Sequence, residues 1–241
     1  MFVSKAGIKC IGWSGIVISR NRILYTKANG YPDTVTFYPI ILRPSNNVVN
    51  SDVIISDNQI IWEMDNVTGS DHRGIQIKGN GTDATGSYRN VTVSNNIVRG
   101  SFRTHISADD IINIKIDNNK VQQLGSYASG TSDFASIALY GTRNGTITNN
   151  TIESGFNLVA SKGTQTINME RVIVIGNDVS GNIDVDNEFL NQVVTSNICS
   201  SISAGTKTLA ARNVGRYRSQ TVVCLGNVEV GVAMEAQITS T

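Results

Sequence analysis

Val91-Thr92-Val93-Ser94-Asn95-Asn96-Ile97-Val98 decides the fold: an alternating strand runs into a turn at an asparagine, and a second strand follows. The same pattern, apolar–x–apolar–x–x–Asn–x–apolar, recurs along the chain at intervals of 20 to 38 residues. A short unit repeated in this way is typical of solenoids, in which each copy forms one coil of a stack. The asparagines of the pattern, with weaker copies at the last two, are Asn21, Asn58, Asn96, Asn119, Asn150, Asn177, Asn197 and Asn227.

A second strand signature precedes most copies of the asparagine pattern. Examples are Gly74-Ile75-Gln76-Ile77-Lys78 and Ser136-Ile137-Ala138-Leu139-Tyr140, in which apolar residues alternate with others. Alternation with period two places Ile75 and Ile77 inside and Gln76 and Lys78 outside. We therefore expect three short strands per coil, in an all-β parallel solenoid that carries its function on outer faces.

The repeated asparagine has two physical reasons. A sharp turn between strands needs a residue with positive φ, and asparagine adopts that conformation more readily than other non-glycine residues. Asparagine side chains stacked in register also hydrogen-bond from coil to coil, about 4.8 Å apart. We expect both roles at the same residues.

Composition and charge narrow the function classes. The 241 residues carry a net charge of +1, which provides no attraction to nucleic acid or to anionic membranes. No apolar run reaches the roughly 18 residues of a membrane span, and the residues after Met1 do not resemble a signal peptide. Cys10, Cys199 and Cys224 fall at inward positions and are expected to be buried free thiols. The two histidines lie far from any thiol in sequence, so we expect no metal site and no cofactor.

The paired strand patterns resemble the right-handed parallel β-helix of the pectate-lyase-like superfamily, and within it they are most similar to bacteriophage tailspikes. The resemblance covers residues 5 to about 187 and implies about eight rungs of three short strands each. It predicts a parallel β-helix over residues 1–187. Residues 188–241 are expected to hold the last rungs and a closing or oligomerisation segment, which we associate with a homotrimer. This segment contains Arg212, Arg216, Tyr217 and Arg218.

The resemblance also implies a function. Tailspike-like proteins bind a bacterial surface polysaccharide, a capsule or an O-antigen, and the pattern leaves open whether this chain depolymerises it as a glycoside hydrolase or polysaccharide lyase. The implied location is the virion tail, outside the cell. One alternative is a structural or assembly module of a virion without enzymatic activity, and another is a fragment of a bacterial polysaccharide lyase or epimerase. The first rung begins at Gly7 without a cap, so we expect a further N-terminal segment or another virion protein to cover it.

Stacked strands place outward side chains in columns, and the strand before each asparagine pattern has columns rich in polar groups. One column is expected to contain Lys78, Asp109, Tyr140, Ser161 and Asp186. Its neighbours are expected to contain Gln76, Ser107, Ala138, Val159 and Asp184, and His105, Ser136, Asn157 and Asn182. Such groups bind sugars by hydrogen bonding and ring stacking.

Catalytic candidates come from the same columns. Glycoside hydrolysis generally uses two carboxyl groups. Asp109 with Asp110 is the first candidate pair, provided that the chain turns at Asp110, and Asp184 with Asp186 is the second. Glu188, Asp133 and Glu153 are expected nearby, and His105 is a candidate acid–base group. The candidate substrate-binding residues are Asp71, His72, Arg73, Lys78, Arg103, Tyr140 and Asn157.

Overall fold

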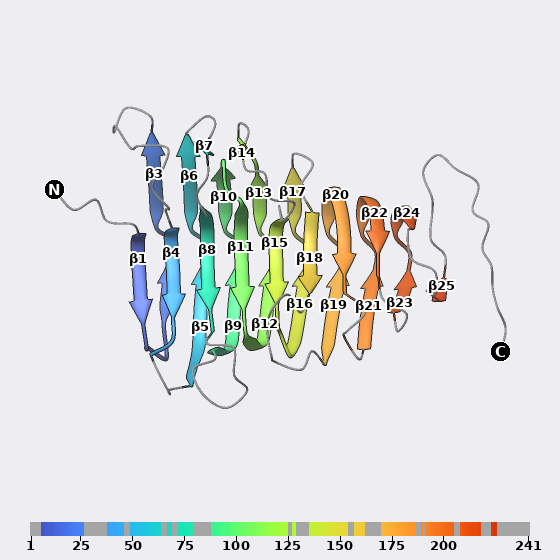
Figure 1. The fold of residues 1–241 in the computed structure, drawn as a ribbon, viewed down its shortest axis with the longest axis horizontal. Helices are drawn as coiled ribbons and strands as arrows, with labels where there is room; N and C mark the ends of the chain where they lie inside the picture. The colour runs from blue at the N-terminus through green and yellow to red at the C-terminus, as the bar shows by residue number, and fades with distance from the viewer. Residues whose placement is uncertain are drawn as a thin grey trace.

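Every strand pairing in the computed structural model is parallel, and apart from one pair of two-residue strands, each strand pairs with strands that lie one circuit earlier or later in the chain. The structure describes residues 6–26, 38–45, 49–63, 67–68, 72–79, 88–124, 127–128, 135–153, 157–161, 170–186, 189, 191–204, 208–217 and 223–225. These residues contain strands and no helix. The fold is therefore all-β and β-helix-like, an elongated stack of coils with the first and last described strands at opposite ends of the long axis (Figure 1).

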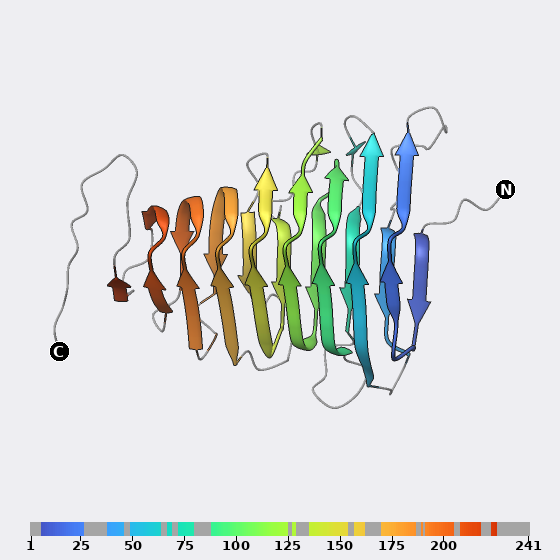
Figure 2. The same ribbon diagram turned by 180° about the vertical axis from the view of Figure 1, so that it is seen from behind.

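Three series of parallel strands run along the stack, seen from opposite sides in Figures 1 and 2. The first comprises β1 (Ala6–Ile11), β4 (Tyr38–Arg43), β8 (Arg73–Lys78), β11 (Thr104–Asp109), β15 (Ala135–Tyr140), β18 (Asn157–Ser161) and β20 (Asp178–Val185). The second comprises β2 (Val17–Ser19), β5 (Asn50–Ser56), β9 (Tyr88–Ser94), β12 (Ile111–Asp117), β16 (Asn144–Thr148), β19 (Arg171–Ile175), β21 (Asn191–Thr195), β23 (Thr208–Ala211) and β25 (Val223–Leu225).

The third series comprises β3 (Arg22–Thr26), β6 (Gln59–Glu63), β10 (Ile97–Gly100), β13 (Lys120–Gln122) and β17 (Thr151–Glu153). It continues into β20, which also belongs to the first series because its two halves pair with β17 and β18. The last strands of this sheet are β22 (Ile198–Ser203) and β24 (Val214–Tyr217), and the short β7 (Val67–Thr68) and β14 (Tyr127–Ala128) pair with each other. Strands β21 to β25 thus continue the parallel pairing beyond residue 187.

The core is a set of aliphatic columns that run between the strand series. One column joins Ile40, Ile75, Ile106, Ile137, Leu158, Ile183 and Ile202 in register, and each of these side chains is fully buried. Burying such a side chain stabilises the fold by about 1.5–3 kcal/mol. The prediction that alternate residues of the Gly-Ile-x-Ile strands point inward is confirmed. Of the cysteines, Cys199 is buried and Cys10 half-buried, both with free thiols, while the side chain of Cys224 lies outside the described part.

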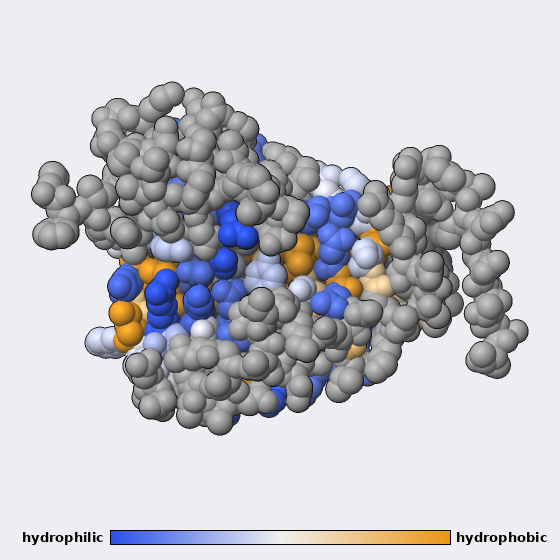
Figure 3. Space-filling view, viewed as in Figure 1, coloured by the Kyte–Doolittle hydropathy of each residue, from blue (hydrophilic) through white to orange (hydrophobic). Residues whose placement is uncertain are grey.

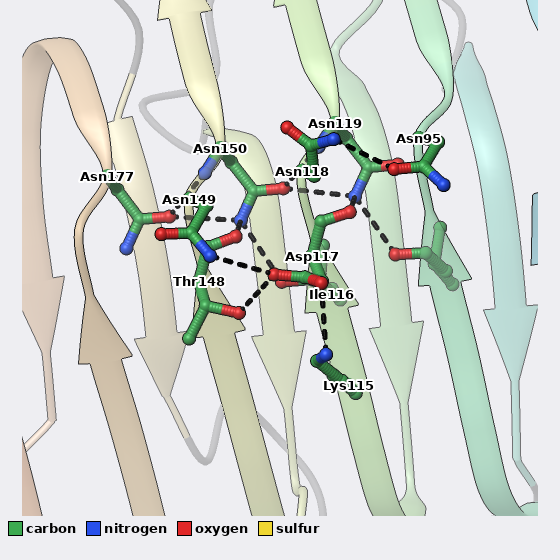
Figure 4. Close-up of polar contacts among 11 residues, drawn as sticks. Asn95, Lys115, Ile116, Asp117, Asn118, Asn119, Thr148, Asn149, Asn150 and Asn177 are labelled. Atoms are coloured by element: carbon green, nitrogen blue, oxygen red, sulfur yellow. Dashed lines mark hydrogen bonds and ion pairs between the residues drawn. The ribbon is translucent and has the colours of Figure 1, made fainter. Parts of the chain in front are cut away.

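An asparagine ladder crosses the turns between the second and third strand series (Figure 4). The side-chain Oδ1 of Asn119 accepts two hydrogen bonds from Asn96, one from its backbone N–H and one from its side-chain amide, both 3.0 Å long. The amide of Asn119 in turn donates to Oδ1 of Asn150 and to the carbonyl of Val93, one coil back. The coil-to-coil pattern is the same along Asn21, Asn58, Asn96, Asn119, Asn150, Asn177, Asn197 and Asn213.

The prediction that the repeated asparagine itself has positive φ was wrong by one residue. The left-handed conformation belongs to the residue before each ladder asparagine, for example Asn118 at φ 52° and Asn149 at φ 55°. The corresponding residues in the other coils are Arg20, Asp57, Asn95, Gly176, Ser196 and Arg212. The ladder asparagine itself has no positive φ, because its side chain must point into the stack to bond its neighbours. The turn residue and the ladder residue are thus adjacent but distinct, and Asn213, which the sequence pattern missed, is a further ladder residue.

This division predicts opposite outcomes for one substitution at two adjacent sites. Asn119→Gly removes the Oδ1 that accepts both bonds from Asn96, so we expect a loss of about 3 kcal/mol in the free energy of unfolding. Asn118→Gly removes one exposed bond to Asn95 at a residue whose positive φ suits glycine, so we expect a change within about 0.5 kcal/mol. Chemical denaturation of the two variants measures the difference. Equal losses would contradict the separation of roles.

Candidate functional site

Two of the three outward columns of the first strand series have the register that the sequence predicts, whereas in the third a register shift pairs Asn157 with Ala135 instead of Ser136. Asp109 lies between Lys78 and Tyr140, and Tyr140 pairs with Ser161. The backbone N–H of Asp186 donates to the carbonyl of Ala160, at the end of the same column. In the neighbouring column the registers join Gln76, Ser107, Ala138, Val159, Asp184 and Ser203. The lateral face of β8, β11, β15, β18 and β20 is therefore the candidate site.

Burial divides this lateral face into two parts. Gln76, Ser107 and Ser136 are fully or almost fully buried although their side chains point outward from the strands. The expectation of an open polar face is therefore wrong at Gln76, Ser107, Asp109 and Ser136, while Lys78 at the end of β8 is exposed. From Tyr140 onward the outward side chains are half-buried, and Figure 3 shows hydrophilic and hydrophobic side chains together on this side of the molecule. The accessible outward groups after β11 are those of Tyr140, Asn157, Val159, Ser161, Asn182, Asp184, Asp186 and Ser203.

Arg73 and Asp109 form an ion pair at the buried part of the face. Nη1 of Arg73 lies 3.4 Å from Oδ2 of Asp109 and 3.0 Å from Oγ of Ser107, and the two charged side chains are 15% and 7% exposed. Removing one partner of such a pair leaves a buried charge without compensation, which costs about 3–5 kcal/mol. The candidate nucleophile or acid Asp109 is thus held by a cation and shielded from solvent.

The chain turns at Asp110, as the Asp109–Asp110 pair requires, but the two carboxylates are not accessible to solvent. Strand β11 ends at Asp109, and Asp110 has φ 58°, so the chain turns between the two carboxylates. Both residues are buried, with relative exposures of 5% and 2%. In this conformation a polysaccharide in solution does not reach them.

The Asp184–Asp186 pair is more accessible. Asp184 lies on β20 beside Val159 and Ser203, and Asp186 follows the end of that strand; both side chains are half-buried. The charge of Asp184 adds to burial in raising the pKa of the Cys199 thiol to about 12, so this thiol is protonated at neutral pH. Asp184 and Asp186 therefore provide carboxylate acceptors on the open part of the face.

His105 is a buried, neutral side chain rather than an exposed acid–base group. Its Nε2 lies 3.1 Å from the carbonyl of Gly100 and 3.2 Å from that of Gln122, so Nε2 carries the proton and donates. Its Nδ1 has no hydrogen-bond partner among the described residues. Burial lowers the pKa of His105 to about 4, and the two carbonyl bonds oppose this only in part. A histidine with this pKa is a poor general base for a substrate that does not reach it.

The sequence did not reveal the aromatic cluster around this histidine. Phe102 packs edge-on against His105 and Trp62, with ring centroids 5.4 and 5.9 Å away. Trp62 also contacts Tyr25 and His72, at 5.5 and 5.3 Å. His72 is 1% exposed and belongs to this cluster, so its expected place on a sugar-binding surface was wrong. No local signal marks the cluster, because its members come from different coils.

The remaining predicted residues occupy varied positions. Lys78 is exposed, Arg103 is half-buried with its backbone N–H bonded to the carbonyl of His72, and Asn157 accepts a bond from the N–H of Asn182. Glu153 lies on β17 in the third strand series, paired with Lys120 at 2.8 Å, and not on a loop beside the lateral face as expected. Asp71, Asp133 and Glu188 lie outside the described residues.

The described residues contain neither a candidate metal site nor a candidate membrane-spanning helix. They contain no group of three or more histidine, cysteine, aspartate or glutamate side chains placed to hold a metal ion. Among the same residues no helix has the length and apolar character needed to cross a membrane.

Comparisons with protein-family models, with curated proteins and with solved structures gave no match to this chain. The arrangement of its own residues therefore carries the functional argument.

The buried neutral state of His105 predicts a pH-dependent stability. The unfolded chain binds a proton at this site below about pH 6.5, while the folded chain resists protonation down to about pH 4. Stability from this group is fully present above pH 6.5 and falls through this window, by about 3 kcal/mol in total. In His105→Gln the side-chain amide also donates to the two carbonyls but does not titrate. Between pH 7 and pH 4.5 we therefore expect the free energy of unfolding of this variant to fall by about 2 kcal/mol less than that of the wild type. Denaturant titrations at both pH values measure this, and an identical pH dependence would contradict it.

Proposed function

We propose that the chain binds a bacterial surface polysaccharide, a capsule or an O-antigen, along the accessible part of its lateral face, as part of a tailspike-like protein of a phage virion. The supporting observation is the in-register array of polar outward groups on β15, β18, β20 and β22. Strand stacking spaces these groups by about 4.8 Å, which suits repeated hydrogen bonding to a chain of sugars. The proposal includes the right-handed parallel β-helix of about eight rungs that the sequence predicts.

The accessible groups offer complementary chemistry. The ring of Tyr140 provides an apolar surface for a sugar face, and Asp184 and Asp186 provide acceptors for hydroxyl groups. Oδ1 of Asn157 accepts the N–H of Asn182, which leaves the side-chain amide of Asn157 as a donor within the described part. Lys78 extends the same column at its other end. A neutral or weakly charged polysaccharide suits this mixture better than a strongly anionic one, because the open part contains two carboxylates.

The proposal is one of recognition, without cleavage. The Asp109–Asp110 pair is buried and Arg73 holds Asp109, so the pair nearest to a hydrolase arrangement supports the structure instead. A second candidate function, a stiff structural rod of a virion, is favoured by the asparagine ladder, which fixes each described coil to the next. The two differ in whether the purified chain binds any host polysaccharide.

Binding to polysaccharides tests the proposal directly. We expect the chain to bind one capsule or lipopolysaccharide preparation in a panel from candidate hosts, measured by surface plasmon resonance. Tyr140→Ala is expected to weaken this binding at least tenfold, because it removes the aromatic surface. Lys120→Ala, on the third strand series, is the matched control and is expected to leave the affinity within twofold.

Three results would contradict this function. One is the absence of binding across the panel, which would favour the rod. Another is a loss of affinity in Lys120→Ala equal to that in Tyr140→Ala. The third is the release of shorter products by the chain, and products that absorb in the ultraviolet would identify a lyase.

The tailspike-like assignment further predicts a homotrimer in solution. Light scattering after size exclusion is expected to give three times the mass of the 25.9 kDa chain, unchanged on dilution into the low micromolar range. A monomer at all concentrations would contradict this assignment but leave polysaccharide binding by one chain standing.

A further inference from the structure

We propose that the first coil, formed by β1, β2 and β3, is a docking surface for one further coil of parallel strands that carries an asparagine in its turn. This inference concerns the end of the stack and is independent of the polysaccharide-binding lateral face. Three observations support it, one from the core, one from the asparagine ladder and one from the surface.

The core is uncovered at the first coil. Ile8 and Cys10 on β1 are half-buried, while their register partners Ile40 and Leu42 on β4 are fully buried. The same contrast holds on β3, where Ile23 and Tyr25 are half-buried and their partners on β6, Ile60 and Trp62, are 0% and 3% exposed. Among the described residues, the inward side chains of the first coil therefore lack the layer that covers the same columns one circuit later. Closing such an end with apolar side chains is favourable by about 25 cal/mol per Å² of apolar surface buried.

The ladder ends at the first coil on an acceptor. Asn21 donates its backbone N–H and its side-chain amide to Oδ1 of Asn58, at 3.0 and 2.9 Å. In each later ladder residue the Oδ1 accepts two such bonds from the coil before it, whereas Oδ1 of Asn21 accepts none from the described residues. The missing partner is one backbone N–H and one amide N–H about 4.8 Å above Asn21, which is what a ladder asparagine of a preceding coil provides.

The surface of the first coil is unusually apolar. Half of the large exposed hydrophobic side chains of the described part lie within it or in its connections: Ile11, Trp13, Val17 and Leu24, with exposures of 48%, 67%, 63% and 41%. The strands of this coil pair with the second coil on one side only among the described residues. An apolar strand edge of this kind recruits another strand through its backbone groups.

The ladder's polarity identifies the occupant. A second copy joined at this end by a two-fold axis would place Oδ1 of one Asn21 against Oδ1 of the other, two acceptors without a donor. A lipid surface would cover the apolar side chains but provide no N–H groups in register. A coil that runs parallel to β1, β2 and β3 and carries asparagine at its turn satisfies the core, the edges and the ladder together.

Cys10 provides a reporter for this docking, because its half-buried thiol lies at the open end of the core. The probe is a copy of residues 38–63, one complete coil with its ladder Asn58, joined ahead of Met1 by a flexible Gly-Ser linker. Tethering raises the effective concentration of the probe to about the millimolar range, so weak affinity does not hide docking. In the copied coil, the residue equivalent to Leu42 is expected to cover Cys10. The rate of maleimide labelling of Cys10 is followed by mass spectrometry, with the buried Cys199 as internal reference.

The expected result is at least a tenfold fall in the labelling rate of Cys10 when the tethered coil carries the native asparagine. The matched control is the same coil with Asn58→Asp in the copy, which keeps its apolar residues but removes the amide donor; it is expected to slow labelling by no more than twofold. The change lies in the probe, so the folding of the host chain is not affected. Equal labelling with and without the native coil, or equal protection by both coils, would overturn the proposal. Protection of Cys10 in the untethered chain that increases with protein concentration would also overturn it, because the occupant would then be a second copy.

Discussion

The hydrogen bonds between asparagines in successive coils are the constraint on which the rest of the structure depends. Each coil of the ladder offers one acceptor to two donors of the coil before it, with distances of 2.9 to 3.0 Å throughout. Yet the chain separation between consecutive ladder residues varies from 16 residues, at Asn197 and Asn213, to 38, at Asn58 and Asn96. The geometry is therefore constant while the chain length of a coil is not. The extra residues of the longer coils must form loops between the strands, because a shift at the asparagine turn would leave buried side-chain amides without hydrogen-bond partners.

A fixed turn also fixes the register of the strands on either side. A shift of one residue would exchange every inward side chain for an outward one, so the fully buried column from Ile40 to Ile202 and the outward column from Lys78 to Ser161 have the same origin. The lateral face is a consequence of this register. Its chemistry is set by which outward groups remain accessible: those of β8 and β11 contribute a buried ion pair and buried hydroxyl and amide groups, and those of β18 and β20 stay within reach of solvent.

Much of this arrangement follows from the sequence, and the exceptions have physical causes. Period-two alternation identified the inward residues, because only one side of each strand faces the core. The same pattern placed the positive φ at the ladder asparagine when it belongs to the residue before it, as at Asn118 and Asn119, since both residues are polar and sequence alone does not separate a turn from a buried amide. Burial of His105 and Asp109 was missed because periodicity gives the direction of a side chain and not what lies over it. The contact of Trp62 with Phe102 joins two coils, and no local pattern encodes it.

The exchange of side-chain amide protons with solvent, followed by NMR, tests the central claim most directly, because it reports on each asparagine separately. If the ladder connects the coils, the amide protons of the buried residues Asn96, Asn119, Asn150 and Asn177 exchange as slowly as the backbone amides of the core strands. The amide of the exposed neighbour Asn118 then exchanges at least a hundredfold faster. Exchange of Asn119 at the rate of Asn118 would show that the ladder does not hold the coils together, and the columns built on it would lose their basis.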